Sequence, residues 1–295
     1  MALIMVLWVI SLMTIMAGSF SLTTRRETEQ LTHAHERAKA TALAEGAINY
    51  AMFMLSLPNQ QFRWKSDGTP YLWQFEKSVV RIRILDEGGK VDLNAAQEQT
   101  LKTTLRFALG NEEQANRLGD IILDWRDQDD TRRTSGAEMD DYLALKSQSP
   151  PQNRNFLILD ELRGVLGITP KIYRQLENWF TLYSGSDGLN TSKASPEILM
   201  ALMRGDRSAV ESYLVQRQQT APGLPGPQLP PIAGLPNSSV ADAAFSVIAE
   251  SAIGDGQRFG VIATIRRGGS NGSPFTYLRW KPYQLPPERP ENRPM

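Results

Sequence analysis

The chain contains no cysteine, and its 295 residues include only two histidines, His33 and His35. The absence of cysteine excludes disulfides, thiolate metal sites and a cysteine nucleophile. Two histidines in one short segment argue against a histidine-based catalytic triad or a histidine-rich metal site. No nucleophile–base pair and no phosphate-binding loop can be picked out either. We therefore predict that the protein is not an enzyme.

Net charge is also lacking, because 32 Lys and Arg side chains balance 32 Asp and Glu side chains. A neutral chain argues against broad attraction to nucleic acid or to acidic membranes. Charge is absent altogether from residues 1–24, and the first charged side chain is Arg25. At ~1.5 Å per residue this run is long enough to span a hydrocarbon core of ~30 Å as a helix. A secretory signal peptide is the alternative, but it requires a basic segment before the apolar core. We predict a retained transmembrane and filament helix over residues 1–24.

The helix is predicted to continue over residues 25–57 as an amphipathic segment, and Pro58 ends it. Its total length would be roughly 85 Å at the rise of an α-helix, far more than a bilayer requires. Small side chains recur along this segment, and small residues let neighbouring helices approach closely. We therefore predict a partner-binding face that includes Ala34, Ala38, Ala42 and Ile48.

Strand patterns occur on both sides of a long helical stretch. Residues 78–85 alternate between apolar side chains and Arg81 or Arg83, as in a half-buried strand, and Glu87-Gly88-Gly89 ends that strand. Strand patterns return near residue 245, with Gly-rich turns between them. We predict an α+β fold in which the long helix packs on an antiparallel sheet that carries an inserted helical domain. The predicted parts are residues 58–91 (first part of a pilin-like head), 92–219 (helical insert), 220–237 (Pro/Gly-rich linker), 238–283 (C-terminal antiparallel strands) and 284–295 (disordered Pro-rich tail).

The insert has features that repeat. Asn94 and Asn190 each precede a helical run, and an asparagine there can accept hydrogen bonds from the first free amides of a helix. Between the two runs, residues 159–176 are predicted to form a helical hairpin, with Gly167 ending one helix and Thr169 capping the next. The insert is thus predicted to contain repeats similar to helix-hairpin-helix modules.

Acidic side chains concentrate in residues 120–141, which hold eight acids and three arginines and so have a net charge of −5. With Asp127 as position 1, Glu138 stands at position 12, where a calcium loop of the EF-hand type places its bidentate carboxylate. Arg132 replaces the glycine of position 6, so we predict an irregular loop rather than a standard EF-hand. The predicted ligands of one structural Ca²⁺ are Asp127, Asp129 and Glu138, with Thr131 and Asp141 as weaker candidates. The alternative is a solvated acidic turn with Asp–Arg pairs; a glycosidase pair is disfavoured because nothing else builds a sugar-binding cleft.

The order and spacing of several motifs resemble the K-class minor pseudopilins of the bacterial type II secretion system. The resemblance covers residues 1 to about 283 and implies a pilin-like α/β head with a large helical insertion. It also implies a place at the tip of a short periplasmic pseudopilus, in a complex with the I-class and J-class minor pseudopilins. The motifs are the N-terminal run, Gly88–Ala96 (GGKVDLNAA), Asp124–Asp127 with Gly136–Glu138, Asp160–Arg163 and Gly188–Asn190.

The resemblance has further implications for the N-terminus. Family members lose a short basic leader to the prepilin peptidase, which also methylates the new N-terminus, so Met1 is expected to be the processed end. Most pilins and pseudopilins carry glutamate at mature position 5, where this chain has Met5. A tip subunit has no neighbour to pair that carboxylate, which would cost on the order of 2–3 kcal/mol in lipid. The implied setting is a single-pass inner-membrane protein with a periplasmic head, in contact with the major pseudopilin and the inner-membrane assembly platform.

A membrane-anchored DNA-binding or uptake protein is the alternative function. Helix-hairpin-helix modules hold the DNA backbone through main-chain amides and nearby basic side chains, and the predicted hairpin carries Lys171 and Arg174. The acidic segment of the same insert would repel phosphate, which favours the pseudopilin interpretation, with no nucleic acid bound.

Overall fold

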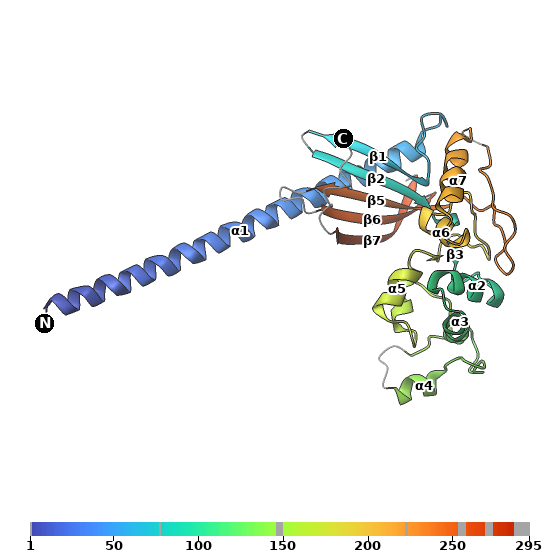
Figure 1. Cartoon of the computed structure of the whole chain (residues 1–295), viewed down its shortest axis with the longest axis horizontal. Coiled ribbons are helices and arrows are strands. Elements are labelled where there is room, and N and C mark those ends of the chain that lie inside the picture. The colour runs from blue at the N-terminus through green and yellow to red at the C-terminus, as the bar shows by residue number, and fades with distance from the viewer. Residues whose placement is uncertain are drawn as a thin grey trace.

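The computed structural model describes residues 2–76, 78–145, 150–221, 224–252, 258–268 and 274–285. A long helix projects from an antiparallel sheet, and short helices gather at the far end of that sheet (Figure 1). The predicted α+β class is confirmed. Met1, most of the Gly-rich turns before and after residues 258–268, and residues 286–295 of the predicted tail lie outside the described residues.

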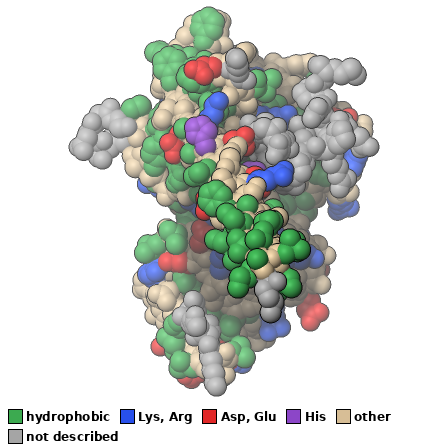
Figure 2. All heavy atoms as spheres, turned by 90° about the vertical axis from the view of Figure 1, so that its left-hand side faces the viewer, with side chains coloured by type: hydrophobic (Ala, Val, Ile, Leu, Met, Phe, Trp, Pro, Cys, Tyr) green, Lys and Arg blue, Asp and Glu red, His purple; other side chains and the backbone are tan. Residues whose placement is uncertain are grey.

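Helix α1 (Ala2–Ser56) is continuous through the membrane-type segment and the head. Every described residue up to Arg25 is exposed, and Figure 2 shows apolar side chains gathered on the projecting helix in front of the head. By length and composition, α1 is the one helix in the described part of the chain that could cross a membrane. The helix is therefore consistent with a single-pass anchor.

The last four turns of α1 pack on the sheet with small side chains. Their four-residue spacing places them on one face, and alanine lets the helix lie close to the strands. This face differs from the predicted partner face, and Ile48 is fully buried in the protein's own core, so its assignment as a partner-binding residue is wrong. The buried residues of α1 are Ala40, Ala44, Ala47, Ile48, Ala51 and Leu55.

The sheet is antiparallel throughout and has the strand order β1-β2-β5-β6-β7. The predicted alternation is confirmed in β2, where Val80, Ile82 and Ile84 are fully buried. Both edge strands contain a proline, Pro70 in β1 and Pro282 in β7, and proline has no N–H to offer to a further strand. The strands are β1 (Asp67–Phe75), β2 (Ser78–Asp86), β5 (Ala244–Ala252), β6 (Arg258–Arg267) and β7 (Phe275–Leu285), so the first two residues of the predicted tail belong to β7.

The insert follows β2 and has its own hydrophobic core, separate from the core between α1 and the sheet. A short parallel pair of strands, β3 and β4, joins the start of the insert to the segment that follows α5. The elements are η1 (Glu87–Gly89), β3 (Val91–Asp92), α2 (Glu98–Leu109), α3 (Glu112–Arg126), α4 (Met139–Ala144), η2 (Leu159–Gly164), α5 (Pro170–Leu176), β4 (Phe180–Thr181), α6 (Pro196–Leu202) and α7 (Arg207–Gln219).

The predicted asparagine caps are wrong. Asn94 exchanges two 2.9 Å hydrogen bonds with the backbone of Phe156, and α2 begins only at Glu98. Asn190 accepts from Ser192 and Gln228, and Ser195 caps α6 instead. In the hairpin the Thr169 cap is confirmed, but η2 is a 3₁₀ helix rather than an α-helix.

The predicted linker, residues 220–237, packs against the insert rather than connecting two parts freely. The Tyr213 hydroxyl donates to the Pro227 carbonyl at 2.5 Å, and the amide of Leu229 donates to Thr191 at 3.0 Å. Leu235 is buried in the insert core.

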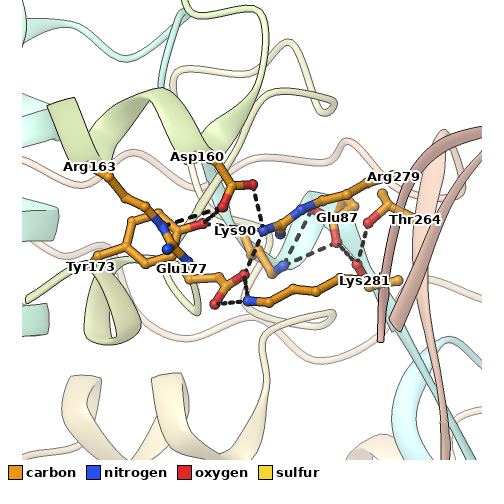
Figure 3. A network of polar contacts seen from close by, with 10 residues as sticks. Glu87, Lys90, Asp160, Arg163, Tyr173, Glu177, Thr264, Arg279 and Lys281 are labelled. Carbon is orange, nitrogen blue, oxygen red and sulfur yellow. Dashed lines mark hydrogen bonds and ion pairs between the residues drawn. The ribbon is translucent and has the colours of Figure 1, made fainter. Parts of the chain in front are cut away.

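A polar network joins the insert to the last strand of the sheet (Figure 3). Arg279 lies 2.9 Å from both Asp160 and Glu177, and Lys281 lies 2.6 Å from Glu177. Burial alone would raise the pKa of Glu177, but the Lys281 hydrogen bond and the Arg279 charge outweigh it and lower that pKa. The insert is thus fixed to the head partly by charge.

We expect Lys281→Gln to destabilise the protein by about 1 kcal/mol at pH 7. Because the pKa of Glu177 is lowered on folding, this contribution is fully present above the unfolded value of about 4.5 and is lost as the pH falls through the folded value. Denaturant unfolding of both proteins across this pH range measures the difference. Lys171→Gln, an exposed lysine on α5, is the control. A difference that persists unchanged at low pH contradicts the prediction.

Candidate functional site

The exposed side of α1 is the first candidate surface. Ala34, Ala38 and Ala42 are all exposed, and at about 100° per residue they lie away from the face that packs on the sheet. Phe53 follows Ala42 by eleven residues, so it lies on the same side, and it is 57% exposed. Small residues followed by an exposed aromatic side chain suit close contact with another helix.

The acidic loop between α3 and α4 is the second candidate. Asp124 is fully buried at the end of α3, and the Arg133 guanidinium lies 2.6 Å from it. The same guanidinium lies 2.5 Å from Asp127. Gly136 packs so closely on Asp124 that a Cβ atom would lie 1.7 Å from its Oδ2. The loop is therefore folded tightly around a buried carboxylate.

Several acceptor atoms in and beside this loop are buried and have no hydrogen-bond partner among the described residues. They are Oδ1 of Asp127, both carboxylate oxygens of Glu138 and Oδ1 of Asn153. Burial, together with the charges of Asp124 and Asp127, raises the pKa of Glu138 to about 7. A buried carboxylate among other acids is unfavourable unless a cation compensates it.

The structure separates the predicted ligands into two groups. Asp127 and Glu138 belong to the buried part of the loop. Asp129 is exposed and accepts from the amide of Thr131 at 2.8 Å, which lowers the pKa of Asp129. Asp141 pairs with Arg132 at 3.0 Å.

Sequence reasoning missed other acceptors near Glu138. The charges of Asp124 and Asp130 help to raise the pKa of Glu138. Asn153 donates a hydrogen bond to Asp130 at 2.9 Å. Asn153 comes 26 residues after Asp127 in the chain, so the spacing of the loop could not reveal it. Among the residues that the structure describes, no three acidic or histidine side chains are already placed to hold a metal ion. Arg133 pairs with Asp127, and Arg132 pairs with Asp141.

Comparisons with known proteins agree on one family. Residues 82–185, from β2 to just beyond β4, match the family model of the type II secretion system (T2SS), protein K. The type II secretion system protein K of Dickeya chrysanthemi is 32% identical over 120 residues, which cover 38% of this chain and 33% of that protein. The match thus spans about a third of the curated relative.

A solved structure shares the fold. A chain of the crystal structure of the GspK-GspI-GspJ complex from the type 2 secretion system of enterotoxigenic Escherichia coli aligns with a TM-score of 0.54 at 17% identity. The alignment covers 89% of this chain and 99% of that chain. The family model and the Dickeya chrysanthemi relative confirm the predicted resemblance to type II secretion system protein K, and the solved structure confirms the fold.

Proposed function

We propose that the protein is a non-enzymatic minor pseudopilin of a type II secretion system, anchored in the inner membrane by α1 with its head in the periplasm. In this role it initiates and caps the pseudopilus at its tip and so serves protein export across the outer membrane. The observation that carries the proposal is the combination of one continuous helix with a pilin-like head whose insert matches the protein K family. The comparisons give no support to the DNA-binding alternative.

Two features support a place at the tip. The insert lies at the end of the sheet opposite the projecting helix, where its bulk is far from the helical shaft of a filament (Figure 1). Met5 leaves no carboxylate that would require a neighbour's terminal amine in lipid. Both suit a subunit with partners on one side only.

The proposed partners are the I-class and J-class minor pseudopilins, with the major pseudopilin and the assembly platform below them. The solved structure that shares the fold is a complex of GspK, GspI and GspJ. Because both sheet edges carry proline, addition of a partner's strand is disfavoured, and we assign the contact to the exposed side of α1.

Replacing Ala38 and Ala42 together with leucine is expected to weaken association with the I-class and J-class proteins by about tenfold or more, because bulky side chains keep helices apart. Co-purification of the full chain from detergent measures this, and secretion by a strain that carries the variant tests the function. Ala144→Leu, an exposed alanine on α4, is the matched control. Unchanged association and secretion in the double variant would count against the proposed face and the proposed function.

We also propose that the acidic loop holds one Ca²⁺ with a structural role. Asp127, Glu138 and Asn153 supply buried oxygen atoms that have no partner, and Ca²⁺ accepts six to eight oxygen ligands in irregular geometry. When bound, the ion supplies the positive charge that the clustered carboxylates lack. Arg133 would move off Asp127, while Asp129, Thr131 and Asp141 lie in the exposed or Arg132-paired part of the loop.

A further inference from the structure

A basic cleft of about 230 Å³ lies where four segments of the chain meet. Its walls come from the loop after α1, from the residues before α6, from the C-terminal end of α7 with the residues that follow it, and from the residues before β5. Four basic side chains line it against two acidic ones, Asp67 and Asp242, which leaves a net charge of +2 on its walls. The basic residues are Arg63, Lys65, Lys193 and Arg217.

Three of these cations form no ion pair with a carboxylate of the described residues. Arg63 donates to the Leu57 carbonyl at 3.0 and 2.8 Å, and Lys65 donates to the Gln218 carbonyl at 2.8 Å. These carbonyls end α1 and α7, so both side chains interact favourably with helix C-termini and keep further N–H groups for another acceptor. Within the described ranges no ion pair includes Arg63, Lys65 or Arg217.

Arg217 is the most buried charge of the cleft. It is only 7% exposed, and its two terminal nitrogens donate to the backbone carbonyls of Ala194 and Asp67, each at 2.7 Å. Its Nε–H has no hydrogen-bond partner among the described residues. Burial lowers the pKa of Arg217, and the nearby charge of Asp67 offsets this effect only in part. An anion bound nearby would supply the missing negative charge.

We propose that this cleft binds an oxyanion group, either a carboxylate or a phosphate, through Arg63 and Lys65. Arg217 contributes positive charge from the wall, and so does Lys193, which lies 3.7 Å from Asp86 and 3.9 Å from Asp242. The volume is that of several water molecules, which suits one such group rather than an extended ligand. Guanidinium and ammonium groups are the side chains that hold carboxylate and phosphate through charge-assisted hydrogen bonds. This site is independent of the α1 face and of the acidic loop.

Calorimetric titration of the full chain in detergent tests the proposal. The ligands are inorganic phosphate and a short peptide with either a free or an amidated C-terminus. We expect the wild-type protein to bind phosphate or the free-acid peptide, more weakly at higher salt, and not the amide. Binding of phosphate alone identifies a phosphate site, and binding of the free acid identifies a carboxylate site.

The variant Arg63→Gln/Lys65→Gln should bind at least about tenfold more weakly. Arg106→Gln/Arg117→Gln removes two exposed charges from α2 and α3 and is the matched control, expected to bind as wild type. If the double variant fails to fold, Lys65→Gln alone replaces it. The proposal is overturned if neither ligand binds at millimolar concentration, if the amide binds as well as the acid, or if the cleft variant binds as tightly as the control.

Discussion

Gly89→Ala is expected to destabilise the protein by at least about 3 kcal/mol, because the new methyl group would collide with backbone. A Cβ atom at this position would lie 2.3 Å from the carbonyl oxygen of Lys193 and 2.5 Å from its carbon. Backbone held in a packed core cannot move aside as a flexible side chain can. Gly88 is constrained in the same way, with the Val240 carbonyl oxygen 2.2 Å away. The two glycines fix the approach of the insert to the sheet.

Thermal unfolding of the full chain in detergent measures this effect, and the expected fall in Tm is roughly 6–12 °C. Gly18→Ala is the matched control, because it is the same change in a helix with nothing within 4 Å. Its Tm should equal or slightly exceed that of the wild type, because alanine favours a helix over glycine by up to about 1 kcal/mol. If the Gly89→Ala protein has the same Tm as the Gly18→Ala control, the residues that contact Gly89 can move away from η1 at little cost in free energy.

The sequence predicted that a strand ends at these glycines, but it did not predict the close backbone contacts that require glycine there. Two successive glycines after an alternating strand are sufficient evidence that the strand ends there. The atoms that require them belong to Lys193 and Val240, more than 100 residues further along the chain. No local pattern carries that information, because the contact exists only after the insert returns to the sheet.

The long helix was predictable, but the face that packs on the head was not. Alanines occur on both sides of this part of α1, with Ala38 and Ala42 exposed while Ala40 and Ala44 are buried. Because alanines line both sides of the helix, the two sides differ little in hydrophobicity. The hydrophobic pattern alone therefore does not show which side of the helix faces the sheet. The rotation is fixed instead by the large side chains Ile48 and Leu55, which fill the space over the sheet.

The acidic loop illustrates the same limit. Spacing along the chain brought out Asp127 and Glu138, which the structure does place in the buried part of the loop. The cluster of acids after the loop also suggested Asp141, which instead pairs with Arg132, since three arginines compete for the carboxylates. The acceptor Asn153 belongs to a separate segment, so a motif of twelve consecutive positions could not include it.

Adding Ca²⁺ to chelator-treated protein should raise its Tm, because a ligand that binds only the folded state stabilises it by about 2.7 kcal/mol at a hundred times its Kd. Asp127→Ala and Glu138→Gln should both abolish the rise, since each removes a buried oxygen that otherwise has no partner. Glu113→Gln, an exposed glutamate on α3, is the matched control and should respond to calcium as wild type does.

Glu138→Gln should also stabilise the metal-free protein. Its Tm should therefore be higher than that of wild type without calcium and lower than that of wild type with calcium. In the absence of metal the pKa of Glu138 rises from 4.5 to about 7 on folding. The folded protein therefore holds this proton more tightly than the unfolded chain, and wild type loses stability as the pH rises from about 4.5 to about 7. Glutamine has no charge to bury, so its advantage should reach at most about 3 kcal/mol above pH 7 and vanish below pH 4.5. Melting curves in chelator and in calcium at pH 8 measure both effects. If calorimetry finds no binding at millimolar calcium and the two proteins keep the same order in both buffers, the loop is a solvated acidic turn held by its arginines.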